Sequence, residues 1–126
     1  MLDVDEGTLS RLGHPALGGA VETFVYNELT RLLAASDGGA TVRYLRDRDG
    51  REVDFILEKR GGQVVGIEVK ASSTVTAADF RHLRWLRERI GDRLAGGYVL
   101  HLGAETGSFG DGMAVLPLSA MWHHRT

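Results

Sequence analysis

Hydrophobic residues recur along the first half of the chain with two different periods, and these periods predict a helix followed by three strands. From residue 16 to about 35, apolar residues return every three or four positions, which predicts an amphipathic helix that stops at Gly38-Gly39. Runs rich in β-branched and apolar residues then predict strands at about 41 to 46, 51 to 58 and 63 to 70. The Asp49-Gly50 pair predicts a tight turn between the first two strands.

The second half predicts a helix, a strand, a loop and a second strand. The helix runs from near Thr76 to about 91, and its buried face is predicted to contain Phe80, Leu83, Leu86, Ile90 and Leu94. Further elements are a strand at 98 to 102 after Gly96-Gly97, a glycine-rich loop at 103 to 112, a strand at 113 to 116 and one helical turn at 119 to 123. The strand that follows the helix requires a crossover connection and therefore a parallel partner. This order predicts an α/β fold with a mixed central sheet flanked by helices, in a single domain over residues 1 to 126 with an N-terminal arm at 1 to 15.

Acidic residues interrupt the second and third predicted strands. If residues 60 to 62 form the connecting loop, Asp54 stands opposite Glu68 and Lys70 joins them on the same face of the sheet. The opposite face is predicted to contain Val53, Phe55, Leu57, Val65, Ile67 and Val69. Opposed carboxylates about 5 Å apart repel by roughly 3 kcal/mol at an effective dielectric constant near 20.

Something must offset that repulsion. The ammonium of Lys70, a proton held on one acid, or a divalent metal ion would each do so, since oxygen-rich sites suit such ions. The ordinary alternative is a solvated sheet face on which the long side chains splay apart.

The order of Asp54, then Glu68-Val69-Lys70, with Glu22 on an upstream helix, resembles the PD-(D/E)xK nuclease superfamily. The resemblance implies a restriction-endonuclease-like αβββαβ core. It further implies that Asp54 and Glu68 bind Mg²⁺ or Mn²⁺, with Glu22 and the carbonyl of Val69 as further metal ligands, and that Lys70 orients the attacking water. Val53 stands where the family has proline, which contributes backbone shape rather than ligand atoms. From the helix pattern alone, Glu22 is as well explained as a surface acid near a helix N-terminus.

A closer resemblance covers most of the chain. It rests on the runs at residues 4 to 9, 17 to 29, 46 to 54 and 115 to 122. These runs resemble the uncharacterised domain that follows an AAA+-type ATPase module in many bacterial and archaeal proteins. The resemblance implies that this chain is the C-terminal part of a longer ATPase protein, with that module as its partner. The chain itself contains no G-x-x-x-x-G-K-[ST] loop, and so the resemblance does not make it an ATP binder.

Charge and composition narrow the function only slightly. The net charge of −2 argues against attraction of the whole surface to nucleic acid. The chain has thirteen arginines and two lysines. Four of the arginines gather around the first hairpin, namely Arg43, Arg46, Arg48 and Arg51, where phosphate contact is one interpretation and a solvated charged surface is the other. The chain has no cysteine and no apolar run long enough to cross a membrane, which fits a cytoplasmic protein without membrane contact.

These observations lead to two hypotheses from different classes. The first is a magnesium-dependent nuclease that hydrolyses DNA or RNA, which would make the chain a metal-dependent endonuclease. The alternative is a non-catalytic domain with the same fold that binds nucleic acid or a protein partner, or regulates the attached ATPase. A structural dimerisation domain is a third possibility, and the sequence does not give the oligomeric state.

Overall fold

The computed structural model describes residues 14–35 and 39–123, so the predicted N-terminal arm lies outside the described residues except for His14 and Pro15. These two residues begin helix α2, which starts two positions earlier than predicted. The helical elements are α2 (His14–Ala34), η1 (Ala77–Phe80), α3 (Arg81–Ile90), η2 (Gly91–Arg93) and α4 (Ala120–His123). The strands are β1 (Thr41–Arg46), β2 (Glu52–Glu58), β3 (Val64–Lys70), β4 (Leu94–His101), β5 (Gly107–Gly110) and β6 (Met113–Pro117).

The strands form one mixed sheet in the order β1-β2-β3-β4-β6-β5. β1, β2 and β3 form an antiparallel meander, while β3 and β4 are parallel, as the crossover through α3 predicted. β4 also runs parallel to β6, and β5 pairs antiparallel with β6 at the edge. The α/β class and the mixed sheet are therefore confirmed.

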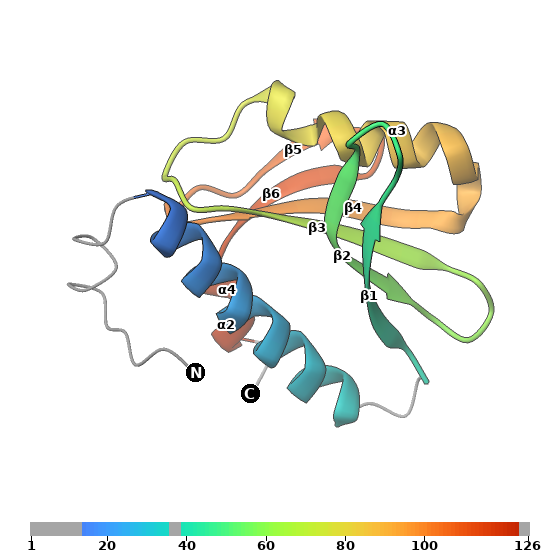
Figure 1. Ribbon diagram of the computed structural model, residues 1–126, viewed down its shortest axis with the longest axis horizontal. Helices are drawn as coiled ribbons and strands as arrows, with labels where there is room; N and C mark the ends of the chain where they lie inside the picture. Colours follow the sequence, from blue (N-terminus) through green and yellow to red (C-terminus); the bar gives the residue numbers. More distant parts are fainter. Residues whose placement is uncertain (1–13, 36–38, 124–126) are drawn as a thin grey trace.

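Helices cover both faces of the sheet, with α2 on one side and α3 on the other (Figure 1). On the α2 side the core contains Val21, Val25, Leu29, Phe55, Ile67, Leu100 and Met121. On the α3 side it contains Val53, Val64, Phe80, Leu83, Leu86, Leu94, Val99, Met113 and Val115. None of the helices in the described residues is long and apolar enough to cross a membrane.

The strand β4 begins four residues earlier than the sequence predicted, at Leu94 rather than residue 98. Leu94 is buried in the sheet and is not part of the α3 helical face. Gly96 and Gly97 lie inside this strand instead of ending a loop. A Cβ atom on Gly97 would stand 2.5 Å from the sulfur of Met113 on β6, so glycine permits the close approach of these two strands.

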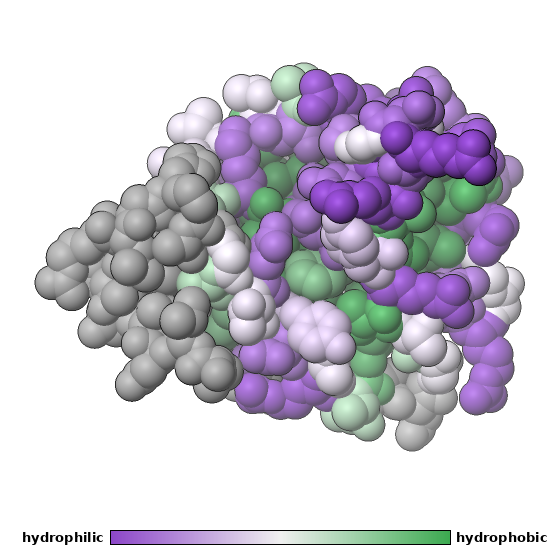
Figure 2. All heavy atoms as spheres, viewed as in Figure 1, coloured by the Kyte–Doolittle hydropathy of each residue, from purple (hydrophilic) through white to green (hydrophobic). Residues whose placement is uncertain are grey.

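The predicted loop at 103 to 112 contains a strand that the sequence did not reveal. β5 occupies Gly107–Gly110 and pairs with β6 in a short hairpin at the edge of the sheet. Glycine is disfavoured in strands by propensity, which is why the local pattern indicated a loop. The pairing with β6 outweighs that preference here. Polar residues dominate the surface over α3 and the β1–β2 turn, and hydrophobic atoms show between α2 and β1 (Figure 2).

A bulge in β2 changes which face its residues occupy. Arg43 pairs with Ile56 and Leu45 pairs with Val53, so two steps along β1 match three steps along β2. The extra residue lies at Asp54 or Phe55. As a result Val53 packs with the α3 side of the core and Phe55 with the α2 side, and the prediction that both share one face was wrong.

Gly66 is expected to tolerate no side chain. A Cβ atom there would stand 2.7 Å from Cδ2 of Leu83, a fully buried residue of α3. Gly66→Ala should therefore lower the free energy of unfolding by about 1–3 kcal/mol through overpacking. Urea unfolding measures this, with Gly61→Ala as the matched control because a Cβ on Gly61 meets nothing within 4 Å. Equal losses in the two variants would contradict the packing assigned to β3.

Candidate functional site

Two hydrogen bonds connect Asp54 on β2 with Glu68 and Val69 on β3. The backbone N–H of Asp54 donates to Oε1 of Glu68 at 3.1 Å, and the N–H of Val69 donates to Oδ2 of Asp54 at 2.8 Å. The regular ladder ends one step earlier, at Phe55 and Ile67, and its register continues to Asp54 opposite Glu68. The N–H of Lys59 donates to the carbonyl of Gln63, which closes the three-residue loop that the sequence predicted. The two side chains thus accept backbone N–H groups at the point where the regular strand pairing ends.

The pKa of Glu68 is raised to about 8, first by desolvation and then by the negative charge of Asp54. Desolvation also raises the pKa of Asp54, and nearby Glu52 adds to this rise, while the hydrogen bond from the N–H of Val69 opposes it. At neutral pH Glu68 therefore holds a proton. That proton offsets the repulsion between the two acids.

Helix α2 brings a third acid, Glu22, to the same place. The carboxyl group of Glu22 lies beside that of Asp54, and both line one cavity. The pKa of Glu22 is raised by desolvation and then by the charges of Asp54 and Glu52. Glu22 is exposed at the edge of α2. The structure therefore gathers three of the predicted site residues, Glu22, Asp54 and Glu68.

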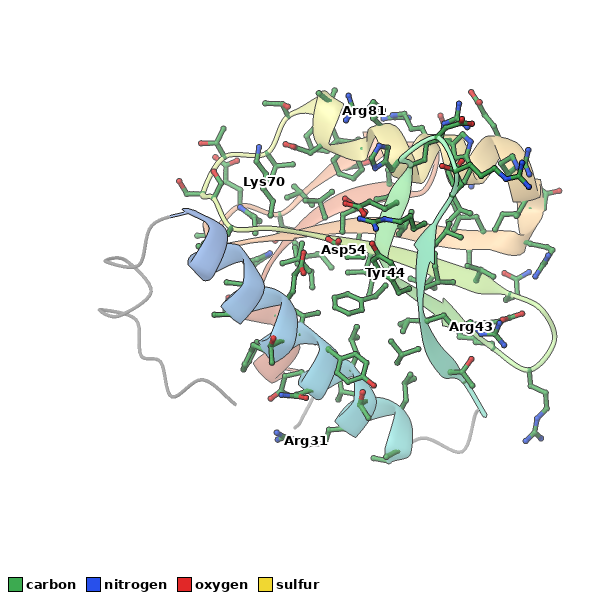
Figure 3. All side chains as sticks on the ribbon, viewed as in Figure 1. Arg31, Arg43, Tyr44, Asp54, Lys70 and Arg81 are labelled. Atoms are coloured by element: carbon green, nitrogen blue, oxygen red, sulfur yellow. The ribbon has the colours of Figure 1, made fainter. Side chains whose placement is uncertain are left out.

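Lys70 points elsewhere. Its Nζ donates to Oδ2 of Asp79 at 2.7 Å. Figure 3 shows Lys70 extending toward the segment that precedes α3 and away from Asp54. Among the described residues, the ion pair that Lys70 makes is the one with Asp79, so its ammonium does not offset the Asp54–Glu68 repulsion.

Asp79 is held by the start of the helical segment that leads into α3. Its Oδ2 accepts the backbone N–H of Thr76 at 2.7 Å in a capping box. Desolvation alone would raise the pKa of Asp79, but the hydrogen bonds from Lys70 and Thr76 outweigh it and lower the pKa. Asp79 is therefore a charged anchor that fixes the ammonium of Lys70 at the end of β3.

The predicted metal ligands are only partly brought together in the structure. Within residues 14–35 and 39–123, no three His, Cys, Asp or Glu side chains are gathered tightly enough to hold an ion as they stand. The N–H of Val69, whose carbonyl was predicted as a ligand, is bonded to Asp54. The donor set is nevertheless all oxygen and anionic, which is the kind that Mg²⁺ and Mn²⁺ prefer.

The arginines predicted to contact nucleic acid are largely paired with local acids. Arg46 lies 3.4 Å from Glu52, and Arg51 lies 3.3 Å from Asp47. The guanidinium of Arg51 also stands 5.3 Å from the ring centre of Trp85, within cation–π range. Arg48 is exposed in the turn that follows β1. Exposed ion pairs of this kind stabilise the fold little, so they can be exchanged for phosphate at low cost.

Residues 17–121 match the family described as "Domain of unknown function (DUF4143)". The chain belongs to this family. The match spans every described strand and covers all of the site acids. The family description assigns no activity, and it is compatible with the uncharacterised domain that the sequence resembles.

A longer protein is also similar to this chain. A protein from Methylobacillus flagellatus described as "Glutamate 5-kinase" is 31% identical over 114 residues. The alignment covers 86% of this chain and 29% of the relative, so the chain spans less than a third of that protein. The kinase description applies to the longer protein as a whole.

Sequence reasoning missed several residues that shape the site. Asp79 follows Thr76 by three positions, and this capping-box spacing was a usable signal. Glu52 accepts a hydrogen bond from the hydroxyl of Tyr44 at 2.8 Å, and its carbonyl lies 2.8 Å from Nδ1 of His82. These last contacts join β1, β2 and α3, and no local pattern predicts them.

Proposed function

We propose that this domain hydrolyses phosphodiester bonds in DNA or RNA with the help of Mg²⁺ or Mn²⁺. The observation that carries the proposal is the hydrogen-bonded pair of desolvated acids, Asp54 and Glu68, whose charges are balanced by a proton on Glu68 and not by Lys70. A divalent cation would replace the proton on Glu68 and neutralise both acids. Such desolvated acids in a partly enclosed place are typical of functional sites.

The donor atoms of these residues, though not their present spacing, suit such an ion. Asp54 and Glu68 each accept a backbone N–H, and a carboxylate has further lone pairs that can coordinate a cation. Glu22 supplies a third carboxylate from α2, and the carbonyl of Val69 supplies a neutral oxygen. Because the three acids are not gathered closely enough as they stand, binding requires rotation of their side chains.

The chemistry follows from the roles of the side chains. Asp54 and Glu68 would hold a divalent cation, and Glu68 would release its proton to solvent when the cation binds. The cation would supply Lewis-acid chemistry, which polarises the phosphate and makes a water molecule more acidic. Lys70 would orient the water or a phosphate oxygen only after its side chain turns from Asp79, to which its ammonium is bound at 2.7 Å.

One observation favours a second candidate function. Lys70, which the nuclease mechanism needs, is occupied by Asp79 at 2.7 Å. A domain whose lysine serves only to anchor the start of α3 would bind nucleic acid or a protein partner, or regulate an attached ATPase, without catalysis. Thermal melts separate the two candidates: magnesium should raise the melting temperature of a metal-binding site through binding linkage, and leave that of an inert acidic face unchanged.

We also infer that the fold is restriction-endonuclease-like and that the domain works beside an AAA+-type ATPase module. The order helix, three antiparallel strands, helix and parallel strand supports the first inference. The greater length of the Methylobacillus relative supports placing the domain within a larger protein. A genomic survey of what precedes such domains would test the association.

Lys70→Ala is the sharpest variant for the catalytic proposal. Purified protein is incubated with single-stranded, duplex and branched DNA and with RNA, in magnesium, manganese or EDTA. Wild type is expected to cleave in magnesium and in manganese but not in EDTA. Lys70→Ala should lower the cleavage rate by about 10²- to 10³-fold. Lys59→Ala, which changes the other lysine on an exposed turn, is the matched control. If no substrate is cut, or if Lys70→Ala cuts as fast as wild type, the enzymatic proposal is wrong.

A further inference from the structure

A cavity of about 300 Å³ lies beside the acids, between α2, β1 and β2. Glu22 and Asp54 line it next to Tyr26, Tyr44, Phe55 and Arg43. In Figure 3 Tyr44 lies near Asp54, with Arg43 further along β1. The volume is at the lower end of the range for small-ligand sites, so it suits one ring system rather than a large molecule.

The walls of this cavity carry exposed aromatic rings. The described part of the chain exposes three large apolar residues, Tyr26 at 49%, Tyr44 at 58% and Leu102 at 41%, and the two tyrosines both line this cavity. Tyr26 packs on Phe55 with ring centres 6.3 Å apart, which holds its ring in place. The hydroxyl of Tyr44 donates to Glu52 at 2.8 Å, which fixes the second ring. Two anchored rings open to solvent are suited to stacking on a flat ligand.

The polar groups of the cavity suit the edge and the phosphate of a nucleotide. Glu22 and Asp54 present carboxyl oxygens to the cavity, and such oxygens can accept hydrogen bonds from amino and ring N–H groups, as acids do when they contact cytosine. Arg43 lies 3.5 Å from the half-buried Glu58, and its own exposed guanidinium can be reached by a phosphate.

We propose that this cavity binds an unpaired nucleobase that bears N–H donors, next to the phosphate at the acid site. The substrate would then be single-stranded nucleic acid or a frayed end, because a base in a duplex is stacked and unavailable. This inference rests on the proposed action on nucleic acid. The same tyrosines and acids would suit an arginine side chain of a protein partner, but Arg43 at the cavity opposes a second cation.

The test compares binding of oligonucleotides by fluorescence anisotropy, in calcium and again in EDTA. The probes are a labelled single strand of about 12 nucleotides, its duplex and a single strand that lacks bases. The single strand with bases should bind most tightly. Tyr44→Leu and Tyr26→Leu should each weaken that binding by about 5- to 100-fold, the range for loss of one stacked base. Tyr44→Phe keeps the ring but loses its hydrogen bond to Glu52, so it is expected to bind more weakly than wild type and more tightly than Tyr44→Leu.

The outcomes separate this inference from the proposed hydrolysis. If the leucine variants weaken binding while wild type cuts nothing, the base site stands and the catalytic proposal falls. If wild type cuts but the leucine variants bind and cut normally, the base site is wrong and the catalytic proposal stands. The base site would be overturned if the strand without bases bound as tightly as the strand with bases. It would also be overturned if an arginine-rich peptide bound more tightly than the oligonucleotide and displaced it. Because Tyr44 is exposed, Tyr44→Leu should keep the wild-type melting temperature, which excludes misfolding.

Discussion

Asp54→Asn is expected to lower the rate of phosphodiester cleavage by about 10²- to 10⁴-fold, because loss of the metal ligand removes several kcal/mol of transition-state stabilisation. Asparagine still offers an oxygen to the N–H of Val69, so the bond that holds β2 and β3 is retained. The variant therefore removes charge and metal affinity with little change in shape.

The measurement is single-turnover cleavage at saturating magnesium, with thermal melts of each variant. Asp92→Asn, which changes an exposed acid in η2, is the control and should cleave as wild type does. Since the neutral amide in Asp54→Asn removes a desolvated charge from β2, the melting temperature should stay the same or rise. A variant that is folded and cuts at the wild-type rate would show that Asp54 holds no catalytic ion.

Sequence patterns predicted the acid pair well because its geometry is local. β1 lies at the predicted residues, and the loop at 60 to 62 fixes the register of β2 and β3 over a short distance. Alternation along a strand then determines which residues face each other. The meeting of Asp54 and Glu68 follows from these two features alone.

The bulge in β2 and the direction of the Lys70 side chain depend on distant parts of the chain. The bulge arises from the pairing of β2 with β1, and it sends Val53 and Phe55 to opposite faces. Alternation gives the face from which Lys70 starts, but its long side chain ends on Asp79, nine positions later. The same holds for β4, where Gly97 reflects contact with Met113 and not a loop. Local propensity does not contain such tertiary contacts.

Glu68→Gln is expected to raise the free energy of unfolding at about pH 8 to 9, by roughly 2–4 kcal/mol, and to leave it nearly unchanged at about pH 4. The pKa of Glu68 is about 8 in the folded protein and 4.5 as an ordinary glutamate. Below the lower pKa, Glu68 is protonated in both the folded and the unfolded protein, so the folded protein carries no penalty for a buried charge at this position. Between the two pKa values the folded state alone holds the proton, and stability falls as pH rises.

Urea unfolding of wild type and Glu68→Gln across this pH range measures the effect, with Glu88→Gln on the exposed side of α3 as the control. The two curves should converge in acid and separate toward high pH, where wild type must bury the charge beside Asp54. Magnesium should reverse part of this loss in wild type, because a divalent cation replaces the missing proton, and should do little for Glu68→Gln. Parallel curves at all pH values would mean that Glu68 is well solvated, and the charge argument for an ion between β2 and β3 would then fail.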